Sequence, residues 1–459
     1  MSSSPRTGHN VLRAAALTAL LVAGPASAVD LIGVHDLALK NDPILQAAAF
    51  RRDATGENER QAFAGFLPAL SGSANTFRGD DESRIDGRGL FPDVTRENDI
   101  DSESWSLDLN QVVYDQANYE RLDLARGQVS QAEAIYQAAY QDFLVRVAVN
   151  YFEVLTTQDR VIFAEAEELA LQRQFEQAEQ KFEVGLTAIT DVYEARASYD
   201  NARARAIVAR NELADAKEGL RQLTGQYFDE VDALQEELPL VDPDPNNIEE
   251  WVQTALEFNP FVVQARFATD IADANVRLQR TGHFPTLNLS AGYSDFTNNS
   301  IQLTNDIGEV IATTSLEAQD FRYGLVLNVP IYQGGLINSR TRQARFELGA
   351  VQQDLEDQQR FTMRETRNAF RAVVAGIEQV QAFGQALISG ESALEATQAG
   401  FEVGTRTIVD VLLAQQRFYG AARDNSLARH TYILNHLRLK LAAGLLTEQD
   451  LRQVNTILE

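Results

Sequence analysis

The sequence contains no cysteine, which excludes disulfide bonds and thiolate metal ligands. Histidine is scarce too, and no two histidines stand at the spacing of a zinc site. No nucleophile motif accompanies the five histidines, which are His9, His35, His283, His430 and His436. We therefore expect no metal, no cofactor and no enzymatic activity, and a fold stabilised by burial alone.

Positively charged residues are also few compared with negatively charged ones. Lysine and arginine number 40 against 66 aspartates and glutamates, a net charge of −26. Such a balance argues against a nucleic-acid-binding surface. It leaves two interpretations: a soluble, self-repelling acidic surface, or a water-filled passage whose lining favours cations.

Long apolar runs are absent beyond the N-terminus. Residues 1–28 have the pattern of a signal peptide, with basic residues, an apolar run over 14–23 and the small residues Ala26-Ser27-Ala28. That run is shorter than the ~20 residues that span a bilayer, which disfavours an N-terminal membrane anchor. The mature chain should begin near Val29, which cannot carry a lipoprotein anchor because it is not cysteine. Any crossing of a membrane must then be made by β-structure.

The chain is an internal repeat. Phe182-Glu183-Val184-Gly185 returns as Phe401-Glu402-Val403-Gly404, at an offset of 219 residues. The register holds to Gly225 and Gly444, with 13 identities over 44 positions. The period far exceeds the ~20 to 50 residues of solenoid repeats, so two large units were duplicated. Each is expected to contain a helix, a strand, a loop, a strand and two long helices.

Most of the chain has helical periodicity. Residues 116–182 contain no proline and one glycine, and their apolar positions recur at three and four. A helix of this length would extend ~100 Å, too far for a globular core, so we expect a coiled-coil-like rod. Gly185 and Gly404 should each end a rod at a hairpin tip. The four helical segments are 116–182, 189–223, 336–402 and 408–441.

Four short segments alternate apolar and polar residues, as strands do. They are 67–77, 105–113, 285–296 and 321–329. Aromatic residues near their ends are typical of outer-membrane strands, although the half-buried sheet of a soluble sandwich would also alternate. We expect 79–103 and 297–320 to be long polar loops, which favours the membrane. Because closed outer-membrane barrels need about 8 strands or more, copies of the chain must share one barrel.

Three motifs resemble the TolC family of outer-membrane export ducts. Residues 401–412 (FEVGTRTIVDVL) resemble the family's second hairpin tip. Residues 329–335 (VPIYQGG) resemble its strand-to-helix junction, and 282–287 (GHFPTL) its helix-to-strand junction. The resemblance covers the chain from about residue 30 to its end.

The resemblance implies a mainly α fold with transmembrane β-structure and a two-fold internal repeat. Each chain would add one long helical hairpin per repeat to an α-helical tunnel, and four strands to a 12-stranded β-barrel shared by a homotrimer. The trimer would lie in the outer membrane of a Gram-negative bacterium, in contact with its lipid, with the tunnel in the periplasm. It would be the exit duct of tripartite efflux pumps and type I secretion systems. Its partners would be a periplasmic adaptor protein and an inner-membrane transporter of the RND, ABC or MFS class.

The resemblance also implies site residues at the hairpin tips. Asp410 of each protomer would contribute to an acidic ring at the tunnel entrance. The alternative is that this carboxylate only caps a helix or faces solvent. Leu413 stands where the family has a second aspartate, which should halve the charge of the ring. The residues expected to contact the adaptor are Val184, Gly185, Leu186, Val403, Gly404 and Thr405, although both glycines could simply end helices.

A latch between the two hairpins is implied as well. Arg406 would bond Thr190 and Asp191, with Gln174 and Gln398 in supporting positions. Phe401 stands where the family has tyrosine, so one hydroxyl bond is expected to be missing. We expect the pair Arg406 and Asp191 to carry most of the latch.

These patterns divide the chain into five parts: signal peptide 1–28, first repeat 29–225, linker 226–247, second repeat 248–444 and C-terminal segment 445–459. Linker and C-terminal segment should form a belt around the tunnel's equator. Two other classes stay open: a passive outer-membrane porin, for which the strands are too few, and a soluble periplasmic coiled-coil scaffold.

Overall fold

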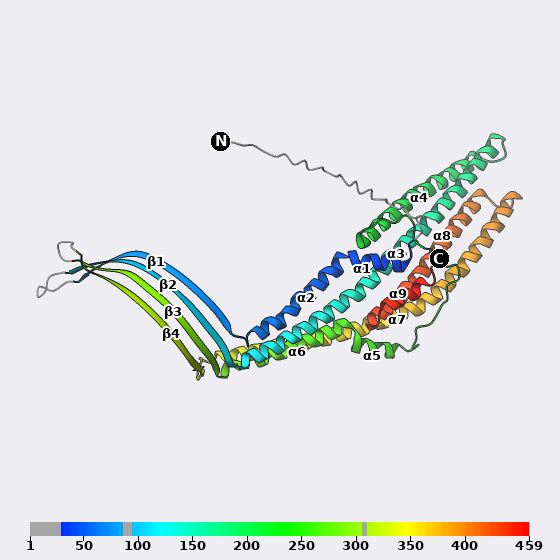
Figure 1. Ribbon diagram of the computed structural model, residues 1–459. Coiled ribbons are helices and arrows are strands. Elements are labelled where there is room, and N and C mark those ends of the chain that lie inside the picture. Colours follow the sequence, from blue (N-terminus) through cyan, green and yellow to red (C-terminus); the bar gives the residue numbers. More distant parts are fainter. Residues whose placement is uncertain (1–28, 86–93, 305–309, 459) are drawn as a thin grey trace, which may run out of the picture.

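The computed structural model describes residues 29–85, 94–304 and 310–458. The signal peptide expected at 1–28 lies outside these residues. The molecule is elongated, with a curved sheet at one end and two helical hairpin tips at the other (Figure 1).

The two halves of the chain repeat one order of elements. The first half contains α1 (Leu31–Asn41), α2 (Pro43–Ala64), β1 (Ala69–Ile85), β2 (Val94–Asp115), α3 (Gln116–Glu183) and α4 (Ile189–Thr224). The second contains α5 (Ile248–Phe258), α6 (Pro260–Arg280), the short 3₁₀ helix η1 (Thr281–His283), β3 (Thr286–Thr304), β4 (Val310–Asn328), α7 (Leu336–Glu402) and α8 (Ile408–Ala443). The helix α9 (Glu448–Asn455) follows.

The first helix of each half is broken in two, where the sequence predicts one helix. Pro43 and Pro260 begin the second pieces, since proline is accepted at the first helical position but not in a helix interior. The residue before each proline caps the new helix: Asp42 accepts from the amides of Ile44 and Leu45, and Asn259 accepts from that of Phe261.

The four strands form one antiparallel sheet in the order β1-β2-β3-β4. The strands are longer than expected, and the prediction of loops at 79–103 and 297–320 is wrong for most of their length. Main-chain pairing does not require an apolar face, so polar residues continue the ladder as far as the pair Ile85 and Val94. Cross-strand polar contacts replace apolar ones, as between Arg78 and Asp101 at 3.2 Å. No helix in the described ranges is long and apolar enough to cross a bilayer.

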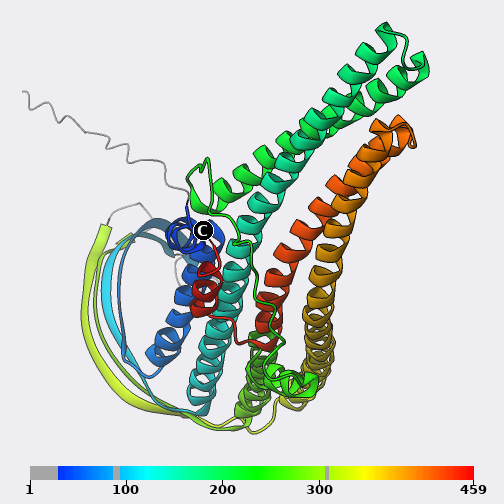
Figure 2. The ribbon, with the colours of Figure 1, turned by 90° about the vertical axis from the view of Figure 1, so that its right-hand side faces the viewer.

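The main core lies midway along the molecule, where α1 and α9 lie beside α3 (Figure 2). Its largest fully buried side chains include Phe143, Tyr151 and Phe152 of α3. Three distant parts of the chain meet there, because Val29 pairs with Val231 and Leu234 pairs with Leu458. Toward the tips the core thins to a seam of small residues between α3 and α4. The buried alanines of α4 are Ala195, Ala202, Ala206 and Ala209.

Candidate gate region at the hairpin tips

The two hairpin tips share one backbone geometry. Gly185 and Gly404 have φ of 77° and 79°, a conformation that glycine adopts without strain. The amide of the next residue bonds back into the incoming helix in both tips, from Leu186 to Lys181 and from Thr405 to Gly400, each at 2.8 Å. The repeat therefore preserves a Schellman-type helix end twice.

Apolar side chains at both tips face solvent. Val184 is 69 % exposed, Leu186 76 % and Val403 76 %. A Cβ added at Gly185 or Gly404 would meet nothing within 4 Å. Exposed apolar groups at the end of a rod are available to a partner.

Asp410 lies in the first turn of α8 and completes a capping box with Thr407, the residue that caps the helix. Its carboxylate accepts from the amide and the hydroxyl of Thr407, both at 2.9 Å, and the Thr407 hydroxyl accepts from the amide of Asp410. These bonds from Thr407, and then the charge of Arg406, lower the pKa of Asp410. Asp410 is therefore ionised at neutral pH and bonded to its own turn. Its repeat partner Asp191 accepts a hydrogen bond from the Thr187 hydroxyl.

Among the described residues, no hydrogen bond or ion pair joins the side chains expected to form the latch to one another. Within the same residues Arg406 makes no ion pair within 4.0 Å, although its charge acts on Asp410, and its stem lies against Gly400. Thr190 is exposed, and Asp191 is partly buried. Gln174 has a buried side-chain oxygen without a partner in the described part of the chain, and Gln398 is partly buried.

The structure joins the two hairpins through a pair that the sequence analysis missed. The Lys181 ammonium lies 4.3 Å from the centre of the Phe401 ring, which places a cation over the aromatic face. Lys181 directly precedes Phe182, the repeat partner of Phe401, but that correspondence does not by itself predict a contact between Lys181 and Phe401. Phe401 also packs against a buried apolar cluster formed by Leu171, Ala178, Val192, Ala195, Ala202, Ile408 and Leu412.

Leu413 lies 45 % exposed on the wall of a groove between α4 and α8. The groove has a volume of about 330 Å³ and is also lined by Glu194, Asn201 and Arg205. Within the described residues no group of three or more His, Asp or Glu side chains could hold a metal ion.

Solved structures show which known fold this architecture shares. The chain is similar to the CmeC outer membrane channel of Campylobacter jejuni, with a TM-score of 0.74 at 16% identity, covering 99% of this chain and 98% of that one. It is also similar to the outer-membrane channel OprN, with a TM-score of 0.70 at 17% identity, covering 90% and 89%. The fold is thus that of outer-membrane channels, and the expectation of a mainly α fold with four strands and a two-fold repeat is confirmed.

Sequence similarity then gives the family. The family described as "Outer membrane efflux protein" matches twice, at residues 34–226 and 251–445, and the chain belongs to it. The chain is 38% identical to the outer membrane protein TolC of Vibrio cholerae over 428 residues, 93% of each chain. It is 35% identical to that of Escherichia coli over 436 residues, 94% of this chain and 86% of the relative. The proteases secretion protein PrtF of Dickeya chrysanthemi is 29% identical over 441 residues, 95% of this chain and 92% of the relative.

Proposed function

We propose that this chain forms the outer-membrane exit duct of efflux pumps and type I secretion systems, with its helical tunnel in the periplasm. One observation carries the proposal: a four-stranded sheet stands at one end of two helical hairpins of 68 and 67 residues in their longer arms. At ~1.5 Å per residue each long arm extends about 100 Å. Relatives named for efflux and for protease secretion support both uses. A duct moves cargo without chemistry, and the chain is not an enzyme.

The working form is proposed to be a homotrimer. Within the described chain β1 and β4 each have one neighbouring strand, so both expose an unpaired edge. Such edges cost several kcal/mol per unpaired polar group in lipid, whereas three copies would close them into a 12-stranded barrel.

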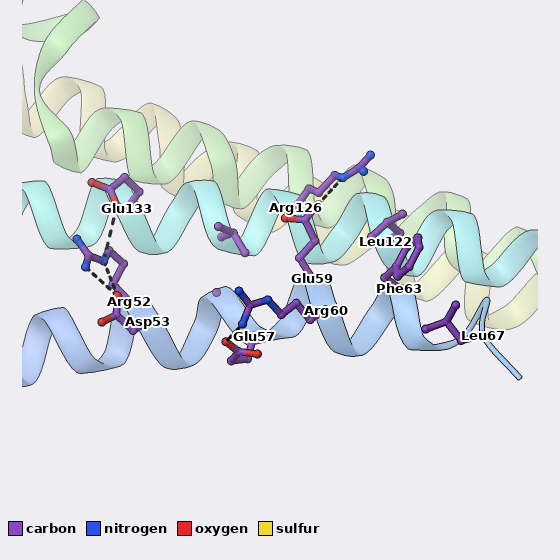
Figure 3. A pocket seen from close by; sticks show the side chains of 12 residues that line it. Arg52, Asp53, Glu57, Glu59, Arg60, Phe63, Leu67, Leu122, Arg126 and Glu133 are labelled. Atoms are coloured by element: carbon purple, nitrogen blue, oxygen red, sulfur yellow. Dashed lines mark hydrogen bonds and ion pairs between the residues drawn. The ribbon is translucent and has the colours of Figure 1, made fainter. Parts of the chain in front are cut away.

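The groove between α2 and α3 is a surface suited to a neighbouring copy. It has a volume of about 830 Å³, with Phe63 and Leu67 at one end and ion pairs along its length (Figure 3). These pairs include Arg60 with Glu57 at 2.6 Å and Arg126 with Glu59 at 3.0 Å. Phe63 and Leu67 are about half exposed in the single chain, which supports burial against a second copy.

The tips are proposed to meet the periplasmic adaptor, through Val184, Gly185, Leu186, Val403, Gly404 and Thr405. Their exposed apolar groups support this contact. The transporter beyond the adaptor would be an inner-membrane protein of the RND, ABC or MFS class. The equatorial belt is proposed to consist of residues 226–247 and 445–459, and the two repeats to run from 29 to 225 and from 248 to 444.

The entrance is proposed to be ringed by one Asp410 carboxylate per protomer and closed by a latch. Arg406 would pair with Asp191, supported by Gln174, Thr190 and Gln398. Arg406 makes no ion pair within the described chain beyond a through-space effect on Asp410, which leaves its donors available to another hairpin. Single-channel conductance in planar bilayers tests the latch: Arg406→Ala should conduct more than the parent. Arg196→Ala, which removes an exposed arginine of α4, is the matched control. Equal currents in all three would contradict the latch.

Export itself is tested in a strain that lacks its own duct. Expression of this chain should restore dye efflux or protease secretion when the cognate adaptor and transporter are co-expressed. A passive porin would admit solutes without those partners. A soluble scaffold would be extracted without detergent and would give no cross-linked trimer. Either outcome would exclude the duct.

A further inference from the structure

Glu167 is a fully buried carboxylate at the junction of three helices. It lies on α3 with 0 % exposure. Arg205 of α4 donates to its Oε1 at 2.7 Å, and Arg423 of α8 donates to its Oε2 at 3.3 Å. The two arginines belong to different hairpins, so this one side chain joins the α3/α4 hairpin to the α7/α8 hairpin.

Stability alone does not account for this arrangement. Removing a carboxylate from water costs several kcal/mol, and apolar side chains of similar volume often stabilise as well as a buried ion pair. Small buried alanines of α4 pack in the neighbouring α3–α4 seam, where the other ion pairs, such as Arg210 with Glu165, are largely exposed. A buried ionic group is therefore better explained by a switch or a positioning role than by stability.

The two arginines are not equivalent. Arg205 makes the shorter bond within the hairpin that contains Glu167, and its Nε is buried without another partner in the described chain. Arg423 makes the longer bond across hairpins. If the hairpins separate, Glu167 loses Arg423 and keeps Arg205, so the carboxylate is never left buried without a counter-charge.

Neighbouring contacts place Glu167 within one continuous seam between α3 and α8. On the tip side, Ile408 and Leu412 of α8 pack in the apolar cluster of Leu171. On the equatorial side, the Ser426 hydroxyl donates to Asp159, and the Thr156 hydroxyl is 2.9 Å from His430 Nδ1. Opening at the tips would therefore progress along the seam and reach Glu167 before these bonds.

We propose that Glu167 is a positioning residue that holds the two hairpins together through Arg423, while Arg205 serves as a permanent counter-ion that permits release. This inference rests on the proposed gated duct. It predicts opposite results from two chemically identical substitutions. Arg423→Met removes the tie between hairpins and favours the open form. Arg205→Met leaves the tie but removes the charge that remains after opening, and so favours the closed form.

Bilayer conductance of the full-length trimer gives the first readout. Arg423→Met should raise the ratio of open to closed states by about tenfold or more, the effect of one charge-assisted bond, and Arg205→Met should lower it. Changes in the same direction, or no change, would overturn the proposal. An inactive parent would instead contradict the duct itself, which keeps the two failures apart.

The second readout does not depend on transport. Because the chain has no cysteine, Asp159→Cys with Ser426→Cys introduces one reactive pair across the seam without background. In detergent, disulfide formation should slow severalfold when Arg423→Met is added, and should not slow with Arg205→Met. Arg423→Lys, which keeps the charge but not the planar fork, should fall between parent and Arg423→Met. Identical rates of disulfide formation in all of these variants would refute the contact between hairpins through Arg423, even if bilayer recordings show no conductance.

Discussion

Four glycines end long helices with nearly the same backbone angle, and only one of them has no room for a side chain. Gly185, Gly225, Gly404 and Gly444 have φ between 76° and 79°. A Cβ at Gly225 would lie 3.7 Å from Asn41, an ordinary contact. At its repeat partner Gly444 it would lie 2.5 Å from the carbonyl oxygen of Phe258 and 2.7 Å from Cα of Asn259. At Gly444, the C-terminal end of α8 is thus in direct backbone contact with the break between α5 and α6.

Alanine at these positions separates the cost of strain from that of crowding. The left-handed conformation costs an L-residue about 1 to 2 kcal/mol, which applies equally to Gly225→Ala and Gly444→Ala. Crowding adds about 1 to 3 kcal/mol at Gly444 alone, because the colliding atoms are backbone and cannot rotate away. We expect Gly444→Ala to lose about twice the free energy of unfolding that Gly225→Ala loses.

Asparagine isolates the cost of crowding, because it tolerates positive φ but its side chain still needs space. Gly225→Asn should be close to the parent and Gly444→Asn should remain strongly destabilised. The assay is thermal unfolding of the detergent-solubilised trimer by circular dichroism at one scan rate, because unfolding of such proteins is often irreversible. For a chain of 459 residues a loss of 1 kcal/mol lowers the midpoint by about 1 °C, so the two sites should differ by about 1 to 3 °C. Equal midpoints for Gly225→Ala and Gly444→Ala would refute the steric argument.

Three further outcomes follow from the same structure. Burial lowers the pKa of His430 to about 4, so between pH 6.5 and 4 the unfolded chain binds more protons than the folded chain. As the pH falls through that window, the free energy of unfolding should decrease by up to roughly 3 kcal/mol. Denaturant titrations of His430→Gln should lack this part of the pH dependence. Tyr151→Phe should lower the free energy of unfolding by about 1 to 3 kcal/mol in the same titration, because the Tyr151 hydroxyl donates to the carbonyls of Val29 and Asp232. Burial raises the pKa of Tyr151, so the hydroxyl stays protonated and able to donate. An unchanged free energy of unfolding would mean that water satisfies the two carbonyls in place of the hydroxyl. A double-mutant cycle of Lys181→Met and Phe401→Leu should give a coupling of about 0.5 to 1 kcal/mol, and additive effects would exclude the cation–π contact.

The long helices were predictable almost to the residue because their signals are local. The range 336–402 is the observed α7, and glycines with positive φ end the rods where expected. The strand ends were not predictable, because polar residues of β1 and β2 are held by pairing across the sheet rather than by an apolar face. The capping box of Thr407 and Asp410 was readable from the sequence, because the two residues stand three positions apart.

The ties between hairpins left no such local signal. Glu167 and Arg423 are 256 residues apart, and their meeting depends on how α3 and α8 pack. Lys181 and Phe401 are likewise distant, and only the repeat relates them. Sequence periodicity locates the rods and tips of this molecule, whereas side-chain contacts between rods require their relative placement.

The meeting of three remote segments at the equator constrains how the molecule can be made. Asn455 donates to Asp30 at 3.0 Å, and Leu458 pairs with Leu234, so residues after the second repeat contact both the start of the first repeat and the linker. Neither duplicated half can make these contacts by itself, although each has its own rods and strands. The segment that follows the second repeat therefore holds the start of the first repeat and the linker, so the two halves depend on one another for folding.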